Sequence, residues 1–558
     1  MLTQSSRNRY QTLLDALVLQ SGDVSRPAII YLTHNAEPIT IARVNFRDGV
    51  RHYAAFFQTQ AIKAGDLLII AHTQSLESIY AFWGAMLIGA IPAMFPTLTE
   101  KLDPTIYMQQ MAELVRLSDV RAIFTTPAFA LQLTAIVDCP VLHPSTLPSS
   151  DAAIPQHHHD ADSIAFLQHS SGTTGLQKGV ALSHRAVLNQ LSAYSDALNL
   201  SSQDVIVSWL PLYHDMGLIA GFLLPLLQGI PLVLMSPFDW VKYPAMLLRA
   251  ITDYQGTLCW LPNFAYNHMT RRIRDRDLDN ISLATMRAFI NCSEPVRHDS
   301  HQQFLERFAP YGLEAKMLSV SYAMAENTFA VTQTPIGTIA TIDIVDRLKL
   351  ESEKIASPIA KDSPSAISIV SCGLPIDGTE VQIVDNDGRV LAERQVGEII
   401  IRSPYMLTEY YKRPDLSPFR DGCYDSGDMG YIADGEIYII GRKKDIIINA
   451  GKNIYPQDIE AIVHMIEGIK TGRVVVFGVP DDRQGTELIA VVAEVLTHDA
   501  DTKHAINRAI RQAVVRQTTI TVNYVTLVDA QWLIKTSSGK IARAANRDKW
   551  LKENAKAP

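Results

Sequence analysis

The sequence predicts an α/β fold with a large N-terminal domain of α/β sheet layers, a β-rich subdomain and a small α+β C-terminal domain. Three observations support this class. Apolar, strand-like runs alternate with helical stretches through most of the chain. Period-two alternation with an Asn-Asp-Gly turn follows at 378–404. Past residue 441 the pattern changes again, so we predict a large domain over 1–441 and a small one over 442–558.

The first predicted elements belong to a parallel sheet. "AGDLLIIAH" (64–72) is a short apolar strand after a Gly-Asp turn, and "SLESIYAFWGAMLIGAIPAMF" (75–95) is a helix that leads into another strand. "VRAIFTTP" (120–127) is a third strand, after the helical "MAELVRLSD" (111–119). Strands and helices at this spacing indicate a parallel sheet covered on both faces.

A polar, proline-rich stretch at 144–163 predicts an exposed connector. It contains the run His157-His158-His159-Asp160, whose side chains could bind a metal ion. A solvated loop is the simpler interpretation of this run, and we prefer it.

The most apolar stretch, 217–237, predicts a buried helix, a turn and a buried strand. Its sequence "GLIAGFLLPLLQGIPLVLMSP" is interrupted by Pro225, Gln228, Gly229 and Pro231, so it lacks the uninterrupted run that a membrane span needs. The N-terminus has an apolar helical face without a continuous apolar run, which favours a surface helix over a signal peptide. We therefore expect no integral membrane segment.

Composition narrows the function classes. Apolar residues make up 47% of the 558 residues and the formal net charge is −8, which is typical of a globular protein and argues against a dedicated nucleic-acid binder. The five cysteines are an odd number and form no Cys-x-x-Cys pair, so a disulfide framework or zinc site is not expected. We expect a protein of a reducing compartment, the cytoplasm.

A glycine-rich loop, "HSSGTTGLQKGV" (169–180), precedes a helix predicted from about Ser183. Successive backbone N–H groups in such a loop can form a concave anion site, and glycine allows close approach to phosphate oxygens. It is not a Walker loop, because Lys178 is followed by Gly179. We predict phosphate binding, with a flexible turn as the alternative. The candidate phosphate ligands are Ser170, Ser171, Gly172, Thr173, Thr174, Gly175 and Lys178.

The loop closely resembles the nucleotide-binding signature of adenylate-forming enzymes, the superfamily of acyl-CoA synthetases, luciferases and peptide-synthetase adenylation domains. Two positions depart from the usual pattern: Gln177 replaces the proline before the loop lysine, and Ile534 replaces the proline before the C-terminal motif that begins at Lys535. The resemblance covers nearly the whole chain. Its other motifs occur in order, as "SYAMAE" (321–326), "YDSGD" (424–428), "GRKKDIIINAGKNIYPQDIE" (441–460) and "KTSSGKIAR" (535–543).

The resemblance implies a barrel-like β-rich subdomain, a hinged C-terminal domain and a reaction in which a carboxylate and ATP form an acyl-adenylate and pyrophosphate. Glu326 would help to position Mg²⁺, and Asp428 and Arg442 would contact the ribose. Lys444 would be the hinge pivot, and Lys540 would be the catalytic lysine between substrate carboxylate and α-phosphate. The residues that would pack against adenine are Ser321, Tyr322, Ala323 and Met324.

Three motifs resemble those of fatty acyl-AMP ligases within this superfamily. "LPLYHDMGLIAG" (210–221) carries their His-Asp-Met-Gly, which makes His214 a candidate catalytic residue. "INCSEPVR" (290–297) resembles the Gly-Ala-Glu-Pro segment of the family, and "YPQDIE" (455–460) has the form typical of these ligases. The second of these motifs supplies the nucleotide-site candidates Ser293, Glu294 and Pro295.

The spacing of the motifs agrees with this branch. Glu326 and Gly373 are 47 positions apart, which is more than acyl-CoA synthetases have. The extra length, about 339–366, matches the insertion of fatty acyl-AMP ligases, which packs against the large domain and impedes the rotation needed for CoA thioester formation. A lengthened surface loop is the alternative interpretation.

The resemblance thus implies a fatty acid substrate, the cofactors ATP and Mg²⁺, and transfer of the acyl group to an acyl carrier protein or a carrier domain of a polyketide or peptide synthetase. A fatty acyl-CoA synthetase stays the alternative within enzymes. A non-catalytic homologue is disfavoured, because Lys540, Glu326 and Asp428 are all present.

Overall fold

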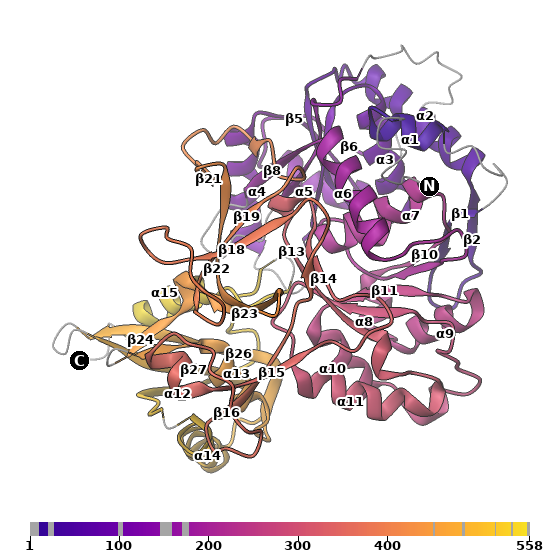
Figure 1. Ribbon diagram of the computed structural model, residues 1–558. Helices are drawn as coiled ribbons and strands as arrows, with labels where there is room; N and C mark the ends of the chain where they lie inside the picture. Colours follow the sequence, from indigo (N-terminus) through magenta and orange to yellow (C-terminus); the bar gives the residue numbers. More distant parts are fainter. Residues whose placement is uncertain are drawn as a thin grey trace.

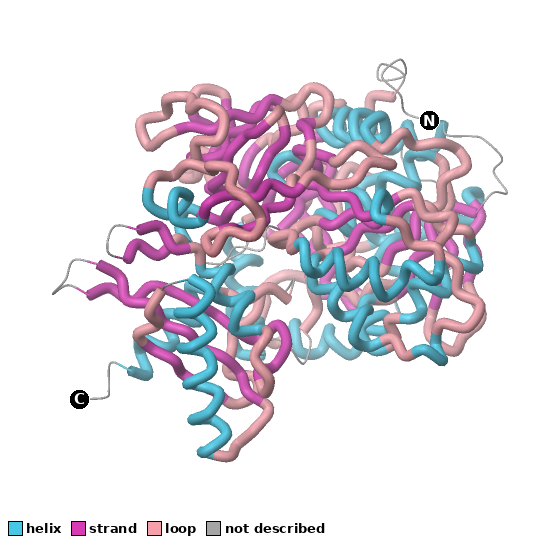
Figure 2. Tube along the Cα trace, turned by 60° about the horizontal axis from the view of Figure 1, so that its bottom comes forward, coloured by secondary structure: helices cyan, strands magenta, loops and turns pink. Residues whose placement is uncertain are grey.

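The computed structural model describes most of the chain, in which two large sheets with flanking helices form the N-terminal part (Figure 1). The C-terminal strands and helices gather at one side of it, away from the N-terminus (Figure 2). The described residues are 10–19, 27–98, 104–144, 159–169, 178–449, 452–481, 486–518, 520–536 and 539–554.

The first large sheet is mostly parallel. Its seven strands are β3 (Leu67–Ala71), β4 (Ile91–Phe95), β5 (Val120–Thr125), β6 (Val141–Leu142), β7 (Ile164–His169), β8 (Gly179–Ser183) and β20 (Glu409–Tyr410). Their order is β20-β8-β7-β4-β3-β5-β6, with β8 and β20 antiparallel to their neighbours. All five residues of β3 and of β4 are buried, as expected for strands covered on both faces. The strands predicted in the first 127 residues are confirmed.

The second large sheet has nine strands with a parallel centre and antiparallel ends. Its strands are β1 (Pro27–Leu32), β2 (Ile39–Ala42), β9 (Ile206–Ser208), β10 (Leu232–Met235), β11 (Leu258–Leu261), β12 (Ala288–Asn291), β13 (Leu318–Ala323), β14 (Ala330–Gln333) and β17 (Leu374–Pro375). Their order is β17-β14-β13-β12-β11-β9-β10-β1-β2. The carboxyl ends of β9, β12 and β13 therefore lie at one edge of this sheet, where open α/β sheets place their ligands.

Helices cover these two sheets. They are α1 (Leu13–Leu19), α2 (Arg43–Thr59), α3 (Leu76–Leu87), α4 (Pro104–Ser118), α5 (Pro127–Thr134), α6 (His184–Ala197), α7 (Leu224–Gln228), α8 (Pro237–Lys242), α9 (Ala245–Tyr254), α10 (Asn263–Arg272) and α11 (His298–Phe308). Helix α6 begins where the sequence predicts, because the Ser183 side chain accepts from the N–H of Ala186 and caps it. The predicted α/β class is confirmed.

Strand β8 is an element that the sequence did not reveal. Its five residues, between the glycine-rich loop and α6, contain a short apolar run that is compatible with either a strand or the start of a helix. It pairs with β7 on one side and, through a partner more than 200 positions away in sequence, with β20 on the other. Non-local pairing of this kind has no local signature.

The apolar stretch 217–237 folds as predicted, with a π-helical segment (Met216–Leu223) that continues into α7, a left-handed Gly229 and then β10. Over the ranges given above, no helix is both long and apolar enough to cross a membrane.

The predicted β-rich subdomain is present as a five-stranded antiparallel sheet. Its strands are β18 (Glu380–Val384), β19 (Gly397–Arg402), β21 (Phe419–Arg420), β22 (Cys423–Ala433) and β23 (Glu436–Arg442). The predicted turn follows β18, where Gly388 has φ +83° and its N–H donates to the carbonyl of Asp385.

The segment that the sequence singles out as an insertion has regular structure. Strands β15 (Ile342–Asp346) and β16 (Ala366–Val370) form an antiparallel pair, with the short helix α12 (Arg347–Ser352) after β15. The side chain of Asp346 caps α12 by accepting from the N–H of Leu348.

The C-terminal part is an α+β arrangement, as predicted. It contains β24 (Ile447–Asn449), β25 (Lys452–Ile454), α13 (Pro456–His464), β26 (Ile469–Asp481), β27 (Thr486–Val495), α14 (Ala500–Thr518), β28 (Tyr524–Val528) and α15 (Arg543–Asn554). Strands β26, β27 and β28 form one sheet, with α13 and α14 packed together over its core of valine and isoleucine side chains. The exact division at 441/442 stays a prediction.

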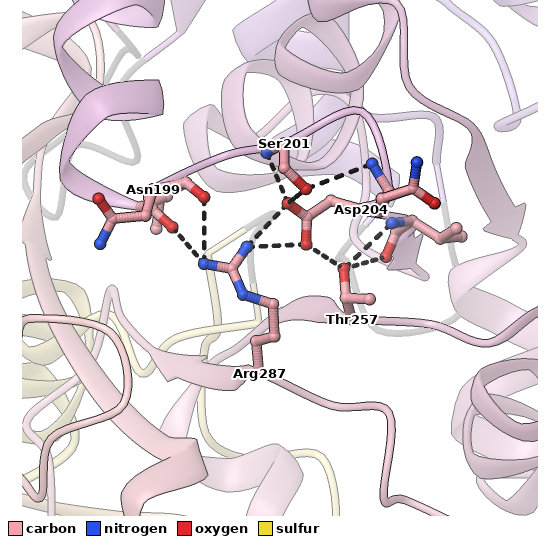
Figure 3. Close-up of polar contacts among 8 residues, drawn as sticks. Asn199, Ser201, Asp204, Thr257 and Arg287 are labelled. Atoms are coloured by element: carbon pink, nitrogen blue, oxygen red, sulfur yellow. Dashed lines mark hydrogen bonds and ion pairs between the residues drawn. The ribbon is translucent and has the colours of Figure 1, made fainter.

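An ion pair between the buried Asp204 and the half-buried Arg287 joins the residues just before β9 and β12 of the second sheet (Figure 3). Arg287 Nη1 donates to both carboxylate oxygens of Asp204 at 2.8 and 2.7 Å, and its Nη2 donates to the carbonyl of Leu198 at the end of α6. Thr257 Oγ1 and the N–H of Ser201 also donate to Asp204. Burial alone would raise the pKa of Asp204, but Arg287 and Thr257 lower it. The cluster stabilises the folded chain.

The histidine run of the connector is only partly described, since His157 and His158 lie outside the described residues. The ring of His159 packs edge-on against that of His184 at 5.8 Å, and Asp160 is exposed. Within the described ranges, no group of three or more His, Cys, Asp or Glu side chains could hold a metal ion.

Candidate active site

Glu326 lies in a tight turn directly after β13. The N–H of Leu407 donates to its carbonyl at 2.8 Å, and Tyr410 Oη donates to its carboxylate Oε1 at 3.0 Å. Burial raises the pKa of the Glu326 carboxyl, and the hydrogen bond from Tyr410 opposes that shift. A half-buried carboxylate oxygen is the type of ligand that Mg²⁺ takes, so Glu326 fits the metal role.

The turn at Glu326 is strained. Thr328 has φ +61° and ψ −53°, and the N–H of Phe329 donates to the carbonyl of Asn327 at 2.6 Å, which is the rarer and strained form of the γ-turn. Thr328 Oγ1 donates to the carbonyl of Tyr405 at 2.7 Å and secures this conformation. A strained backbone beside a candidate metal ligand is typical of functional sites.

The candidate ribose site joins β13 to the β-rich sheet. Tyr322 Oη donates to Asp428 Oδ2 at 2.6 Å, and Arg442 Nε lies 3.2 Å from Asp428 Oδ1. Asp428 and Arg442 are opposite each other in the β22–β23 pair. The Asp428 carboxylate keeps the pKa of Arg442 above its usual range. The structure thus brings together three of the predicted nucleotide residues, and Ser321, Ala323 and Met324 flank Tyr322 on the same segment.

His214 and Asp215 face each other at the start of the π-helical segment. His214 Nδ1 lies 2.5 Å from Asp215 Oδ1, which also accepts from the N–H of Met216 at 2.7 Å. Burial alone would raise the pKa of Asp215, but it is lowered by His214 and by the positive charge of Lys540. The positive charge of Lys540 therefore acts on the His-Asp pair that precedes the π-helical segment.

The segment after β12 lies close to the start of the π-helical segment, next to His214 and Asp215. Ser293 has φ +72° and its Oγ donates to Cys292 Sγ at 3.7 Å and to Met216 Sδ at 3.8 Å. Burial and the nearby Asp215 raise the pKa of the Cys292 thiol to about 12, while Ser293 and Lys540 oppose this. Glu294 Oε2 accepts from the N–H of Phe264, and Pro295 follows it.

Lys178 is the one candidate phosphate ligand of the loop that the structure describes. Its Nζ lies 4.8 Å from the ring centroid of Tyr410. The other six predicted loop residues (170–175) lie outside the described residues, so their predicted role is untested.

Comparison with known proteins identifies the family. The sequence model described as "AMP-binding enzyme" matches residues 21–411, which is well over half of the chain. The chain belongs to the AMP-binding enzymes.

Individual relatives place this AMP-binding enzyme among the fatty acyl-AMP ligases. The medium-chain-fatty-acid–[acyl-carrier-protein] ligase JamA of Moorena producens (strain JHB) is 31% identical, over 98% of this chain and 96% of that protein. A structure from a study of fatty acyl-adenylate ligases of E. coli and L. pneumophila has a TM-score of 0.89 and 27% identity, over 98% of this chain and 99% of that chain. The L. pneumophila fatty acyl-adenylate ligase in complex with acyl adenylate and pyrophosphate has a TM-score of 0.76 and 25% identity, over 99% and 98%. The predicted resemblance and the assignment as an adenylate-forming ligase are confirmed.

The turn around Lys444, which was predicted to be the hinge, is linked by ion pairs to the large part of the chain and to the C-terminal part. Arg442 pairs with Asp428 in the large part of the chain, and Lys443 Nζ lies 2.8 Å from Glu398 Oε2. Asp445 Oδ2 lies 2.6 Å from Arg543 Nη1 in the C-terminal part. Lys444 is in the middle of this turn, and its role as the pivot stays a prediction.

The insertion of this AMP-binding enzyme contacts two regions. On one side Asp343 accepts from Arg394 Nη1 and from Tyr431 Oη, both at 2.8 Å. On the other side Arg347 Nη1 donates to the carbonyl of Gln517, and Asn453 Nδ2 donates to the carbonyl of Glu351 at 3.4 Å. The insertion is therefore packed between the β-rich sheet and the C-terminal part.

An apolar cluster lies beneath these contacts. Val345, Leu350 and Ala356 of the insertion pack in one buried cluster with Tyr431 and with Tyr455 of the C-terminal part. A lengthened surface loop would not bury such side chains.

Two residues of the site were not among the site residues predicted from the sequence. Tyr410 precedes a second tyrosine in "TEYYKRP", a stretch without a recognised chemical pattern, and only the fold brings it to Glu326 and Lys178. Asp215 was within the quoted His-Asp-Met-Gly motif, and its pairing with His214 could have been suspected from their adjacency.

Proposed function

We propose that this enzyme activates a fatty acid with ATP and Mg²⁺ and then passes the acyl group to the phosphopantetheine thiol of a carrier protein. The observation that carries the proposal is the arrangement in which Tyr322 and Arg442 hold the Asp428 carboxylate while Tyr410 holds that of Glu326. Lys540 of the C-terminal part supplies positive charge where two anions must meet, and its charge acts on Asp215.

Each part of the nucleotide has residues that we propose to bind it. The Asp428 carboxylate accepts from the two ribose hydroxyls, since an anionic oxygen is a strong acceptor, and Tyr322 and Arg442 hold that carboxylate in position. Ser321, Ala323 and Met324 border the adenine. Lys178 and the loop 170–175 hold the β- and γ-phosphates. Ser293, Glu294 and Pro295 form the wall between nucleotide and acyl group.

In the first step a carboxylate oxygen of the fatty acid attacks the α-phosphorus of ATP. A phosphorus–oxygen bond forms, the bond between the α-phosphorus and the oxygen that bridges to the β-phosphate breaks, and pyrophosphate leaves with the electron pair. Lys540 neutralises the carboxylate and the α-phosphate as they approach. Mg²⁺ bound near Glu326 would neutralise charge on the phosphates. His214 with Asp215 borders the reacting carboxylate.

In the second step the carrier thiol gives its proton to solvent and its sulfur attacks the acyl carbonyl; the bond between the acyl carbon and the phosphate oxygen breaks, and AMP leaves with the electron pair as the thioester forms. Two observations support a carrier thiol in preference to CoA. JamA, with which this chain shares 31% identity, is named as an acyl-carrier-protein ligase. The insertion is packed against the C-terminal part, which would restrain the rotation that thioester formation on CoA requires.

The proposed location is the cytoplasm. All five cysteines are free thiols in the structure, and Cys259 and Cys372 are buried in apolar cores where they pack as small hydrophobic residues.

The test is acid-dependent exchange of labelled pyrophosphate into ATP, over a series of fatty acids of increasing length. We expect exchange with fatty acids, and accumulation of acyl-adenylate that a holo carrier protein converts to acyl carrier. Supplying CoA in place of the carrier should yield little thioester. No exchange with any acid would refute the adenylation, and abundant acyl-CoA would favour a fatty acyl-CoA synthetase.

A further inference from the structure

Strand β20 is a short edge strand that connects the two ends of the proposed triphosphate site. It pairs with β8, the strand that begins directly after Lys178, in the register Glu409–Ala181 and Tyr410–Val180. The N–H of Tyr411 donates to the carbonyl of Gly179 at 2.8 Å. The backbone of β20 therefore fixes the chain next to Lys178.

The residues before β20 fix the turn of Glu326. The N–H of Leu407 donates to the Glu326 carbonyl at 2.8 Å, and the carbonyl of Tyr405 accepts from Thr328 Oγ1 at 2.7 Å. Residues 405–411 thus bond to both the lysine-bearing strand and the carboxylate-bearing turn.

The side chain of Tyr410 makes the same connection. It is 6% exposed, its Oη donates to Glu326 Oε1 at 3.0 Å, and its ring lies 4.8 Å from Lys178 Nζ. Tyr424 Oη lies 3.2 Å from Tyr410 Oη and limits the rotation of that hydroxyl. A cation on the ring face and an anion at the hydroxyl are the two charged partners that a tyrosine accommodates best.

We propose that Tyr410 is a positioning residue that holds the Lys178 ammonium and the Glu326 carboxylate at a set separation, so that phosphate and metal are gripped as one unit. The inference rests on the proposed function, because it concerns the triphosphate and Mg²⁺ of that reaction. The ring acts on the phosphate side through Lys178, and the hydroxyl acts on the metal side through Glu326.

The test separates the effect of the Tyr410 ring on ATP binding from the effect of its hydroxyl. Tyr410→Phe keeps the ring beneath Lys178 and removes the hydrogen bond to Glu326, whereas Tyr410→Leu removes both. Tyr411→Phe is the matched control, because Tyr411 is the adjacent residue and its ring contacts Lys412 instead of the site. Calorimetric binding of ATP is measured without fatty acid, once in EDTA and once in saturating Mg²⁺.

For Tyr410→Phe we expect unchanged ATP affinity in EDTA and a loss of about tenfold in the strengthening that Mg²⁺ confers, the size typical of one hydrogen bond to a charged group. Tyr410→Leu should also weaken ATP binding in EDTA. In a protein that already carries Lys178→Met, Tyr410→Leu should cause no such additional loss. Tyr411→Phe should match the wild type in both media.

Equal weakening in EDTA and Mg²⁺ for Tyr410→Phe would show a merely structural role and overturn the proposal, and so would no change in either. If Tyr410→Phe unfolds, as judged by its thermal midpoint, Tyr424→Phe replaces it and should reduce the Mg²⁺ effect in the same direction. A wild-type protein that binds no ATP, or shows no acid-dependent pyrophosphate exchange, would instead refute the proposed function.

Discussion

Replacing Glu351 by glutamine should stabilise the protein at pH 8 far more than at pH 5. Glu351 is on α12 of the insertion, at its contact with the C-terminal part, and is 5% exposed. Burial raises the pKa of its carboxyl to about 7, with Arg347 and Lys452 opposing the shift and Asp458 adding to it.

The sign follows from linkage between protonation and folding. An acid whose pKa is raised in the folded state favours folding below its unfolded pKa and loses that contribution as the pH rises toward the folded pKa. For Glu351 the loss occurs between about pH 4.5 and pH 7. The difference between the two pKa values corresponds to about 3 kcal/mol of unfolding free energy at pH 8, and to about 1 kcal/mol at pH 5. Glutamine carries no charge at either pH and avoids the loss.

The measurement is urea unfolding of wild type and Glu351→Gln at pH 5, 6, 7 and 8. Taking the difference between the two proteins at each pH removes the titration of groups that they share. Glu353→Gln is the control, because Glu353 is exposed on the same segment and its substitution should change stability by less than about 0.5 kcal/mol. A wild-type-to-variant difference that stays flat from pH 5 to pH 8 would refute the reasoning.

Three further outcomes are expected. Arg287→Met leaves the buried Asp204 without its two hydrogen bonds from the guanidinium, so thermal unfolding at pH 7 should show a loss of about 3 kcal/mol; a change below about 0.5 kcal/mol would contradict this. Lys540→Ala should lower the rate of acyl-adenylate formation by a factor on the order of 10² while ATP affinity by calorimetry changes little, and equal losses of both would count against its role. Leu350→Ala opens a cavity beneath the insertion, of the kind that lowers the free energy of unfolding by about 2–5 kcal/mol. The insertion should then restrain the C-terminal part less, so acyl-CoA formation, measured by chromatography, should rise. An unchanged yield of acyl-CoA would show that the insertion does not restrain the C-terminal part.

Local residue patterns were sufficient to predict many of the secondary-structure elements of this protein. The continuous apolar run of β3 and the serine cap of α6 depend on neighbouring residues, so their place in the chain could be predicted. The roles of Asp428 and Lys540 were predicted from the resemblance of their motifs to those of adenylate-forming enzymes, and they stay predictions. The family comparison confirms the branch that these motifs indicated.

Tertiary structure alone decided which of these groups meet. Tyr410 reaches Glu326 across 84 positions of sequence, and the insertion lies between the β-rich sheet and Tyr455. Strand β8 exists because β7 and β20 satisfy its backbone hydrogen bonds on both sides. Such contacts result from the packing of many side chains over a common core, and no short stretch of sequence contains the information that specifies them.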